Sequence, residues 1–380
     1  MQLKLWKLSA AGLGLALFAI LPNAPAHPAS ILDDEEEAEE SEEEEEDGDE
    51  FVALLGGDIH TVTGPVLRGA TLLVKNGKIE EMGYDIDVPE DAETYAIDGM
   101  RVYPGLVATS SLGLLGGTGD LNDTIDPFNS RMVLALAAGI TTTGQGGVVA
   151  KLKRFEVDGA VMDDARRVAT FGWDTRNPAS KRSLREKLQV ASKYLRELRK
   201  WENEVKKNKD LEEPSKKGVD NTVLSVLRGE IQAKFNINDR TDLLGLARLA
   251  QEFGFRPLLE GAAEGWTVAD ELGRAGVTAI VTPRSRRSKN ERLVADAGTS
   301  IENAAKLHGH GVPVVVVPAS RGISLGGIVG QDLLHLPIEA GFAIRGGLSE
   351  QAALESITIQ AARVLGLGHR IGSIEVGKDA

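Results

Sequence analysis

Hydrophobic and polar residues alternate between residues 51 and 102 in short runs that are typical of β-strands. The expected strands are residues 51–55, 59–62, 70–74 and 78–82. Turn-forming residues separate them, and the pair Asn76-Gly77 is a strong hairpin signal. The pattern therefore predicts a small antiparallel β unit at the start of the folded chain.

Beyond Pro104 short apolar runs alternate with amphipathic stretches of helical period. The expected strands include residues 139–143, 256–259, 277–281 and 312–317. The expected helices include residues 131–138, 243–253, 268–275 and 300–308. Repeated strand–helix units over about 240 residues favour an α/β fold with a parallel sheet, and this length suits a closed (β/α)8 barrel of the TIM type.

Residues 180–213 have a different pattern, in which leucines recur at spacings of three, four or seven on a strongly charged background. Such a pattern predicts one long charged surface helix with a single apolar stripe. We expect this helix to lie on the wall of the barrel. A dimer contact or a lid over the barrel is the alternative interpretation.

The first fifty residues carry a separate signal. Two lysines, an apolar run over 8–21 and Ala24-Pro25-Ala26 predict a signal peptide, residues 1–26, that is cleaved after Ala26. Its fourteen-residue apolar run is too short to span a bilayer comfortably, so we expect a secreted or periplasmic protein without a membrane span in the mature chain.

Residues 27–50 contain fifteen acidic residues in an acidic low-complexity run. We interpret this run as a disordered, solvated linker; the alternative is a sink for cations or a tether to a basic partner. The net charge of the chain is −14, of which residues 51–380 carry only −1. Aromatic residues are also sparse, so we expect no nucleic-acid binding. The chain has no cysteine and therefore no disulfide.

Three segments in the same order carry a family resemblance. They are Gly56–Gly64 with Asn76–Ile79, Asp98-Gly99 with Tyr103–Val107, and Gly347–Ala380 with its closing Gly-Ser-Ile-Glu-Val-Gly-Lys-Asp-Ala. Together they resemble the amidohydrolase superfamily, in particular its imidazolonepropionase-like and dihydroorotase-like branches of metal-dependent hydrolases.

The resemblance covers residues 51–380 and implies a domain organisation. A β-sandwich subdomain is expected from residues 51–102, an amidohydrolase-like barrel from 103–366, and a return to the sandwich over 367–380. The family continues past Gly-Lys-Asp-Ala with another strand, whereas this sequence stops at Ala380, so the return is expected to be truncated. Three interpretations are open: the β unit has an open edge, the sequence is a fragment, or a partner supplies the strand.

The resemblance also implies metal chemistry at the carboxyl ends of the barrel strands, where a zinc-type ion activates water and polarises a scissile carbonyl. The family's ligands are His-x-His on strand one, histidines on strands five and six, and an aspartate on strand eight. The matching positions in this chain are Ser110, Leu112, Asn236, Gly261 and Ala319. Zinc needs at least three N, O or S ligands, so we predict no cofactor and no metal site on this plan.

Two other features of the sequence carry residue types that could take part in chemistry. His308-Gly309-His310 has the spacing of a ligand pair, but it closes a predicted helix at the opposite end of the barrel, so we interpret it as a helix cap. Hydroxyl and amide side chains near the strand ends are pocket candidates, and Ser110 lacks a nearby base that would make it a nucleophile. These candidates are Thr109, Ser110, Ser111, Asn236, Asn238 and Ser320.

Two functional hypotheses follow. The first is an exported pseudoenzyme that has lost the metal site and serves as a non-catalytic scaffold for a small-molecule ligand or a partner, such as an active amidohydrolase paralogue or a second copy of the chain. The second is an active hydrolase of carbon–nitrogen bonds, such as dipeptide-like amides, with a rebuilt or shared metal site. The replaced ligand positions favour the first hypothesis, because the second rests on fold analogy alone.

Overall fold

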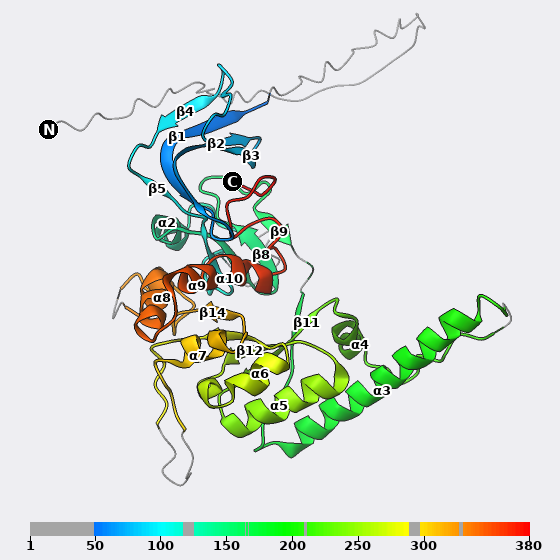
Figure 1. Ribbon diagram of the computed structural model, residues 1–380. Coiled ribbons are helices and arrows are strands. Elements are labelled where there is room, and N and C mark those ends of the chain that lie inside the picture. The colour runs from blue at the N-terminus through cyan, green and yellow to red at the C-terminus, as the bar shows by residue number, and fades with distance from the viewer. Residues whose placement is uncertain are drawn as a thin grey trace, which may run out of the picture. The chain divides into compact units, whose positions relative to one another are not determined.

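The computed structural model describes residues 49–116, 125–163, 165, 167–208, 211–288, 297–326 and 330–380 (Figure 1). The predicted signal peptide, residues 1–26, and nearly all of the predicted acidic linker, residues 27–50, lie outside these residues. Within them, no helix is both long and apolar enough to cross a bilayer.

Residues 51–102 form one mixed sheet in the order β3-β2-β1-β4, with β5 also paired to β1. Its strands are β1 (Phe51–His60), β2 (Val66–Lys75), β3 (Lys78–Gly83), β4 (Glu93–Ala96) and β5 (Arg101–Val102). The predicted hairpin is confirmed, since Asn76 and Gly77 take φ values of 48° and 70° between β2 and β3.

The predicted antiparallel unit is correct only for β1, β2 and β3. Strands β4 and β5 instead run parallel to β1 along its other edge. Residues 84–92 carry the chain to that edge without a hairpin, so no turn imposes an antiparallel direction. The described residues form a single sheet here, and the second sheet of the expected sandwich is not among them.

The C-terminal segment returns to this sheet. Its Ile374 packs into the small apolar cluster of the sheet, beside Ile59 and Ile79. The backbone nitrogen of Ile79 donates to the carbonyl of Lys378 at 2.8 Å, and the nitrogen of Gly377 donates to the carbonyl of Ile79 at 2.8 Å. The buried Lys378 ammonium donates to the carbonyl of Gly368 at 2.9 Å. The closing motif therefore ties the two ends of the described fold together.

Glu375 gives this return a predicted pH dependence. Hydrogen bonds from the hydroxyls of Thr63 at 2.6 Å and Ser373 at 2.7 Å, together with the Lys378 ammonium, lower the pKa of Glu375 to about 2. A carboxyl whose folded pKa is depressed stabilises the fold above its unfolded pKa and loses that contribution as the pH falls toward the folded pKa.

We expect Glu375→Gln to lower the free energy of unfolding by about 1 kcal/mol at pH 7, a small value because the side chain is 43% exposed and screened by water. The difference between the wild type and the variant should vanish as the pH falls from about 5 to about 2. Urea unfolding at several pH values measures it. A difference that stays constant over this range would contradict the assignment.

A five-stranded parallel sheet in the order β10-β11-β12-β13-β14 forms the second half of the chain. The strands are β10 (Val168–Thr170), β11 (Gln232–Ile237), β12 (Pro257–Gly261), β13 (Thr278–Val281) and β14 (Val314–Val316). The helices among them are α4 (Asn221–Arg228), α5 (Arg240–Phe253), α6 (Ala269–Arg274) and α7 (Asn303–Gly309), with a 3-10 turn at Gly265–Thr267. The predicted strand–helix alternation is confirmed in this half, with each named element placed to within three residues.

Capping residues in the sequence mark where helices α4 and α5 begin or end. Asp220 precedes α4 and accepts a hydrogen bond from the backbone nitrogen of Val223 at 3.1 Å, as an N-cap does. Gly229 and Gly254 follow α4 and α5 in the left-handed conformation that glycine adopts without a steric cost.

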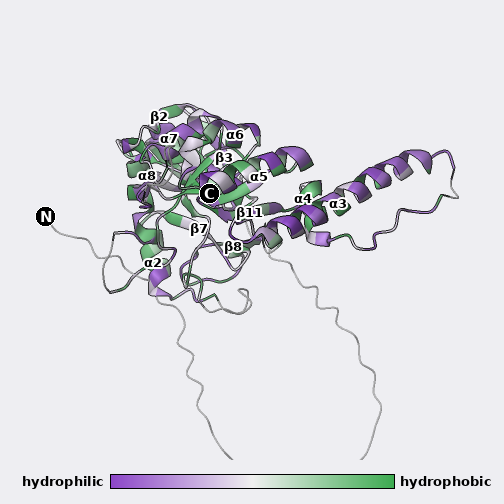
Figure 2. Cartoon of the chain, turned by 90° about the horizontal axis from the view of Figure 1, so that it is seen from below, coloured by the Kyte–Doolittle hydropathy of each residue, from purple (hydrophilic) through white to green (hydrophobic). Residues whose placement is uncertain are grey.

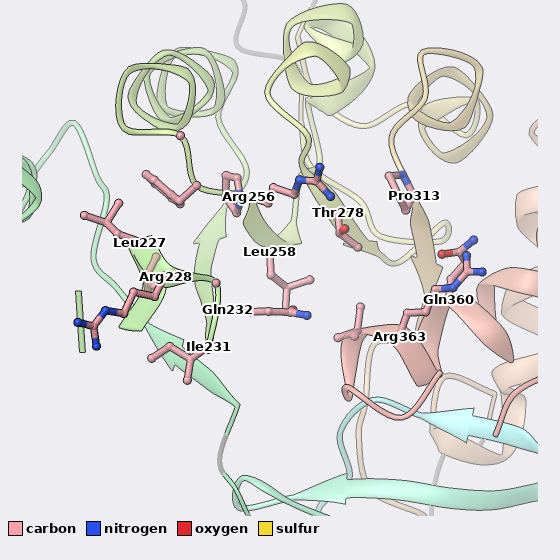
Figure 3. Close-up of a pocket in the computed structure, with 16 residues that line it drawn as sticks. Leu227, Arg228, Ile231, Gln232, Arg256, Leu258, Thr278, Pro313, Gln360 and Arg363 are labelled. Carbon is pink, nitrogen blue, oxygen red and sulfur yellow. The ribbon is translucent and has the colours of Figure 1, made fainter. Parts of the chain in front are cut away.

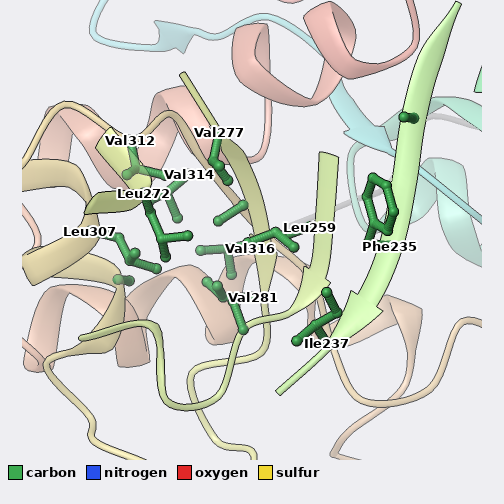
Figure 4. Packing of buried hydrophobic residues seen from close by; sticks show 14 of the residues in the cluster. Phe235, Ile237, Leu259, Leu272, Val277, Val281, Leu307, Val312, Val314 and Val316 are labelled. Carbon is green, nitrogen blue, oxygen red and sulfur yellow. The ribbon is translucent and has the colours of Figure 1, made fainter. Parts of the chain in front are cut away.

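The main core lies between this sheet and its helices (Figure 4). Alternate residues of β11 point into it, namely Ala233, Phe235 and Ile237. The intervening Lys234 and Asn236 therefore lie on the opposite face of the sheet. This alternation is what places polar side chains of the parallel strands on the face away from the helices.

A second sheet in the order β6-β7-β8-β9 contains β6 (Leu106–Ala108), β7 (Ile140–Gln145), β8 (Val148–Lys151) and β9 (Val161–Asp163). The accompanying helices are α2 (Ser130–Ala137), α8 (Leu336–Arg345), α9 (Glu350–Ser356) and α10 (Ile359–Val364), with a 3-10 turn at Leu333–His335. Strands β6 and β7 are parallel, whereas β7, β8 and β9 are antiparallel.

The two sheets share an inner apolar cluster. Val107 of β6 meets Leu258, Ile280 and Val315 of the parallel sheet, and α10 contributes Val364. No strand pairing joins the two sheets among the described residues, so the architecture established here is a mixed α/β fold rather than a ring closed by hydrogen bonds.

Helix α3 (Pro178–Glu204) begins within two residues of the predicted 180–213 helix and ends nine residues before its predicted end. Its buried residues lie in its first two-thirds, up to Tyr194, and mostly hydrophilic residues follow (Figure 2). The buried Asp242 holds the start of α3 in place. It accepts hydrogen bonds from Thr175 and forms an ion pair with Lys181. Burial acts to raise the pKa of Asp242, but these two partners outweigh it and hold that pKa below its usual value.

Candidate functional site

A cavity of about 480 Å³ opens at the carboxyl ends of the strands, and we call it the mouth cavity. Residues 109–112 after β6 and 144–149 of β7 and β8 line one side of it, while Lys234 and Glu260 of the parallel sheet line the other. The backbone nitrogen of Ser111 donates to the carbonyl of Gly144 at 2.7 Å, which holds the loop after β6 against β7. This is the end of the fold at which α/β proteins place their sites.

Glu260 is the central charged group of the mouth cavity. Its carboxylate is 3.1 Å from the Lys234 ammonium and 3.0 Å from the Arg321 guanidinium. Strand pairing sets this geometry, because the register aligns Lys234 with Leu258 and Asn236 with Glu260, all on one face of the sheet. Burial acts to raise the pKa of Glu260, but the two cations outweigh it and lower that pKa.

A second ion pair lies on the other side of the cavity. Asp163, at the end of β9, contacts the Arg167 guanidinium and accepts a hydrogen bond from the backbone nitrogen of Ala165 at 2.9 Å. Burial opposes the effect, but these bonds lower the pKa of Asp163. Among the described residues, both carboxylates that line the cavity are therefore already paired with cations of the protein.

The five positions that match the family's metal ligands do not converge on one point. Ser110 and Leu112 both line the mouth cavity, but Leu112 is 68% exposed and its side chain has no atom that can bind a metal. Asn236 and Ala319 are exposed and are not among the lining residues. Gly261 ends β12 and has no side chain to offer.

The backbone at Gly261 also disfavours a ligand there. Its φ of +100° lies in the left-handed region that residues with a Cβ rarely adopt. A Cβ placed on Gly261 would lie 2.5 Å from the side-chain oxygen of Asn238. That oxygen accepts a hydrogen bond from the backbone nitrogen of Ala263 at 3.3 Å, so Asn238 is held in the space that a larger residue at 261 would need.

The structure brings together only part of the predicted pocket set. Thr109, Ser110 and Ser111 line the mouth cavity. The hydroxyl of Ser111 is 3.1 Å from the side-chain oxygen of Gln145, which also accepts hydrogen bonds from the backbone of residues 114 and 115. The remaining candidates, Asn236, Asn238 and Ser320, do not line it.

The residues present do not fit a zinc-type centre. In the described part of the chain, no three His, Cys, Asp or Glu side chains gather closely enough to hold a metal ion. His308 and His310 close α7, and the Nδ1 of His310 is 2.9 Å from the carbonyl of Lys306, a contact expected of a helix cap.

The sequence pattern predicts the hydroxyl residues of the mouth cavity but not its charged side chains. Lys234, Glu260 and Arg321 are absent from the predicted site, because the family resemblance points to the ligand positions beside them. A signal is present in β11, where Lys234 lies between the apolar residues Ala233 and Phe235, since a lysine is rarely placed inside a fold without a charged partner. Its partner Glu260 interrupts the next strand in the same way.

Comparison with known proteins relates part of this chain to one protein family. Residues 234–380 match the amidohydrolase family. A stretch of 150 residues is 29% identical to imidazolonepropionase of Geobacillus sp. (strain WCH70), and it makes up 37% of this chain and 30% of that protein. The chain thus spans about a third of the length of the curated relative that it matches.

Solved structures extend the similarity beyond that stretch. An amidohydrolase from Thermotoga maritima MSB8 superposes with a TM-score of 0.61 and 25% identity, over 87% of this chain and 92% of that one. Molinate hydrolase shares the fold, with a TM-score of 0.53 and 16% identity over 87% of this chain and 88% of that one. The sequence match over residues 234–380, the order of the motifs and the shared fold together support the assignment of the chain to the amidohydrolase superfamily.

Proposed function

We propose that this protein is an exported amidohydrolase-superfamily member that has lost its metal site and binds a small ligand or a partner at the mouth cavity without catalysis. One observation carries the proposal. Glu260, the carboxylate best placed to serve as a ligand, is held between Lys234 at 3.1 Å and Arg321 at 3.0 Å. A metal ion would have to displace two resident cations to use it, and removing one partner of such a group is costly.

The neighbouring positions support the same conclusion. Gly261 offers no donor, and its backbone conformation and the side chain of Asn238 disfavour any larger residue there. The Asp163 carboxylate is paired with Arg167. What the cavity does offer is three hydroxyls from residues 109–111 and paired charges of both signs, a set that suits a small polar ligand with hydrogen-bonding groups.

The proposal includes a closed (β/α)8-type barrel around the inner apolar cluster, supported by the side chains that β6 and the parallel sheet direct into one shared interior. It also includes export after cleavage behind Ala26 and assembly with an active amidohydrolase paralogue or a second copy of this chain. The composition of residues 1–50 supports the export. The assembly follows from the proposed loss of catalysis, because a non-catalytic chain acts through what it binds.

The test is the metal content of the purified full chain after expression with zinc, manganese and iron available. We expect well below one metal ion per chain, because fewer than three free donors face the mouth cavity among the residues that the structure describes. An active imidazolonepropionase prepared in parallel provides the control that metal was supplied. Metal that is near-stoichiometric and survives dialysis would overturn the proposal and favour a rebuilt or shared site and hydrolysis of carbon–nitrogen bonds.

Two variants make this test specific to the site. Glu260→Gln removes the central carboxylate, and Glu271→Gln on α6 is a matched change away from the cavity. If any bound metal is adventitious, both variants retain the same trace amount as the wild type. A selective loss in Glu260→Gln would show that Glu260 ligates metal, contrary to the proposal.

A further inference from the structure

A second cavity, of about 610 Å³, lies at the opposite, amino ends of the strands. It is bounded by the starts of β11, β12 and β13 on one side and by α10 on the other (Figure 3). We call it the arginine cavity, after Arg228, Arg256 and Arg363 in its lining. Its size falls in the range of sites that hold small organic ligands, about 300–1,000 Å³.

The charge of this cavity is one-sided. Among the described residues, its lining contains three arginines and no aspartate or glutamate. Arg228 is 3.7 Å from Glu230 and points away from Arg363 in Figure 3. Arg256 and Arg363 have no hydrogen-bond or ion-pair partner among the residues that the structure describes. Two unpaired guanidinium groups in one concave site attract an anion and repel a cation.

Neutral polar groups extend the set of possible contacts. The carboxamides of Gln232 and Gln360 and the hydroxyl of Thr278 line the cavity, and Gln360 lies beside Arg363 on α10 in Figure 3. Within the described chain these three side chains have no hydrogen-bond partner either. Unpartnered donors around a cavity are groups that a ligand can satisfy.

Apolar groups form the floor of the arginine cavity. Leu258 and Val364 line this cavity and also the mouth cavity, so the two spaces are separated by a thin apolar layer. Pro257 and Pro313 add further apolar surface at the sides. A ligand that fits this lining therefore needs a compact apolar body as well as a negative charge.

We propose that the arginine cavity is a binding site for a small organic anion, a carboxylate or a phosphate ester with a compact apolar body. The anionic group lies between Arg256 and Arg363, whose planar guanidinium groups match carboxylate and phosphate oxygens with paired hydrogen bonds. The apolar body packs on Leu258 and Val364. This site is separate from the mouth cavity, and the proposal stands whether or not the mouth holds a metal.

Isothermal titration of the full chain with phenyl phosphate, hexanoate and inorganic phosphate tests the proposal. We expect saturable one-to-one binding of phenyl phosphate or hexanoate, and weaker binding of inorganic phosphate, which has no apolar body. Binding should weaken about ten-fold or more in Arg256→Gln/Arg363→Gln, because charge-assisted hydrogen bonds are lost. Arg248→Gln, an exposed arginine of α5 outside the cavity, should change it less than about two-fold.

A measurement without variants covers the case in which the double variant does not fold. Phenylglyoxal labelling of arginines, read by mass spectrometry, should be slowed by the bound anion at Arg256 and Arg363 but not at Arg248. No saturable binding of any probe, or equal weakening by Arg248→Gln, would overturn the proposal. Loss of binding in Lys234→Met instead would assign the anion to the mouth cavity and equally refute it.

Discussion

Replacing Glu339 by alanine is expected to lower the free energy of unfolding by about 3–5 kcal/mol. Glu339 lies on α8 with a side chain that is only 1% exposed. Its carboxylate accepts hydrogen bonds from the backbone nitrogen of Arg284 at 2.8 Å and from its Nε at 2.6 Å. The variant leaves this arginine, which follows β13, without its counter-charge.

The surroundings of Arg284 offer little compensation. One of its terminal nitrogens is already buried without a hydrogen-bond partner in the described structure, and the guanidinium stacks 5.0 Å from the ring centre of Phe342. Water must therefore enter, or the loop after β13 must move. Either outcome costs free energy, because a buried charge without a partner is far less stable than a paired one.

Chemical denaturation of the variant beside two controls measures the effect. Glu350→Ala, at an exposed position in the first turn of α9, should cost less than about 1 kcal/mol. The double change Arg284→Met with Glu339→Leu should cost less than Glu339→Ala alone, since it removes both charges. A loss below about 1 kcal/mol for Glu339→Ala would show that the ion pair contributes little.

The second large effect is expected at Phe235. Phenylalanine-to-alanine changes in well-packed cores cost about 3–5 kcal/mol, and Phe235 is the largest of the fully buried side chains. Its ring lies between those of Phe171 and Phe255, at centre distances of 5.9 and 6.3 Å. Phe235→Ala therefore removes aromatic contacts on two sides and leaves a cavity behind β11.

Two further variants separate packing from general loss of an aromatic residue. Phe235→Leu should cost only about 1–2 kcal/mol, because much of the volume is kept. Phe128→Ala, at a side chain that is 70% exposed, should change the free energy of unfolding by well under 1 kcal/mol. Thermal or urea unfolding measures all three, and a Phe235→Ala loss no larger than that of Phe128→Ala would refute the packing argument.

Much of the parallel half was predictable from the sequence because its signals are local. Residues such as Asp220, Gly229 and Gly254 mark helix ends by capping chemistry that depends on a few neighbouring residues. The alternation in β11 similarly identifies which side chains face the core. The direction of β4 was not predictable, since parallel pairing with β1 depends on where residues 84–92 carry the chain.

The candidate site also combines features that depend on local sequence with features that depend on distant residues. The position of residues 109–111 at the mouth follows from the end of a short strand, which is a local feature. The contact of Glu260 with Arg321 joins residues 61 positions apart, and its existence depends on how the loop after β14 folds back. The positive φ of Gly261 could not be predicted either, because the sequence does not show which of its allowed conformations a glycine adopts.

The conformation of Gly261 limits what can replace it. A substitution that introduces histidine at residue 261 would place its Cβ against Asn238 and force an unfavourable backbone conformation, so the variant would be less stable without gaining a metal site. Asn238 would have to change as well, and that change gives no benefit while glycine remains at 261. A histidine at residue 261 thus requires two coupled substitutions, the first of which lowers the stability of the fold.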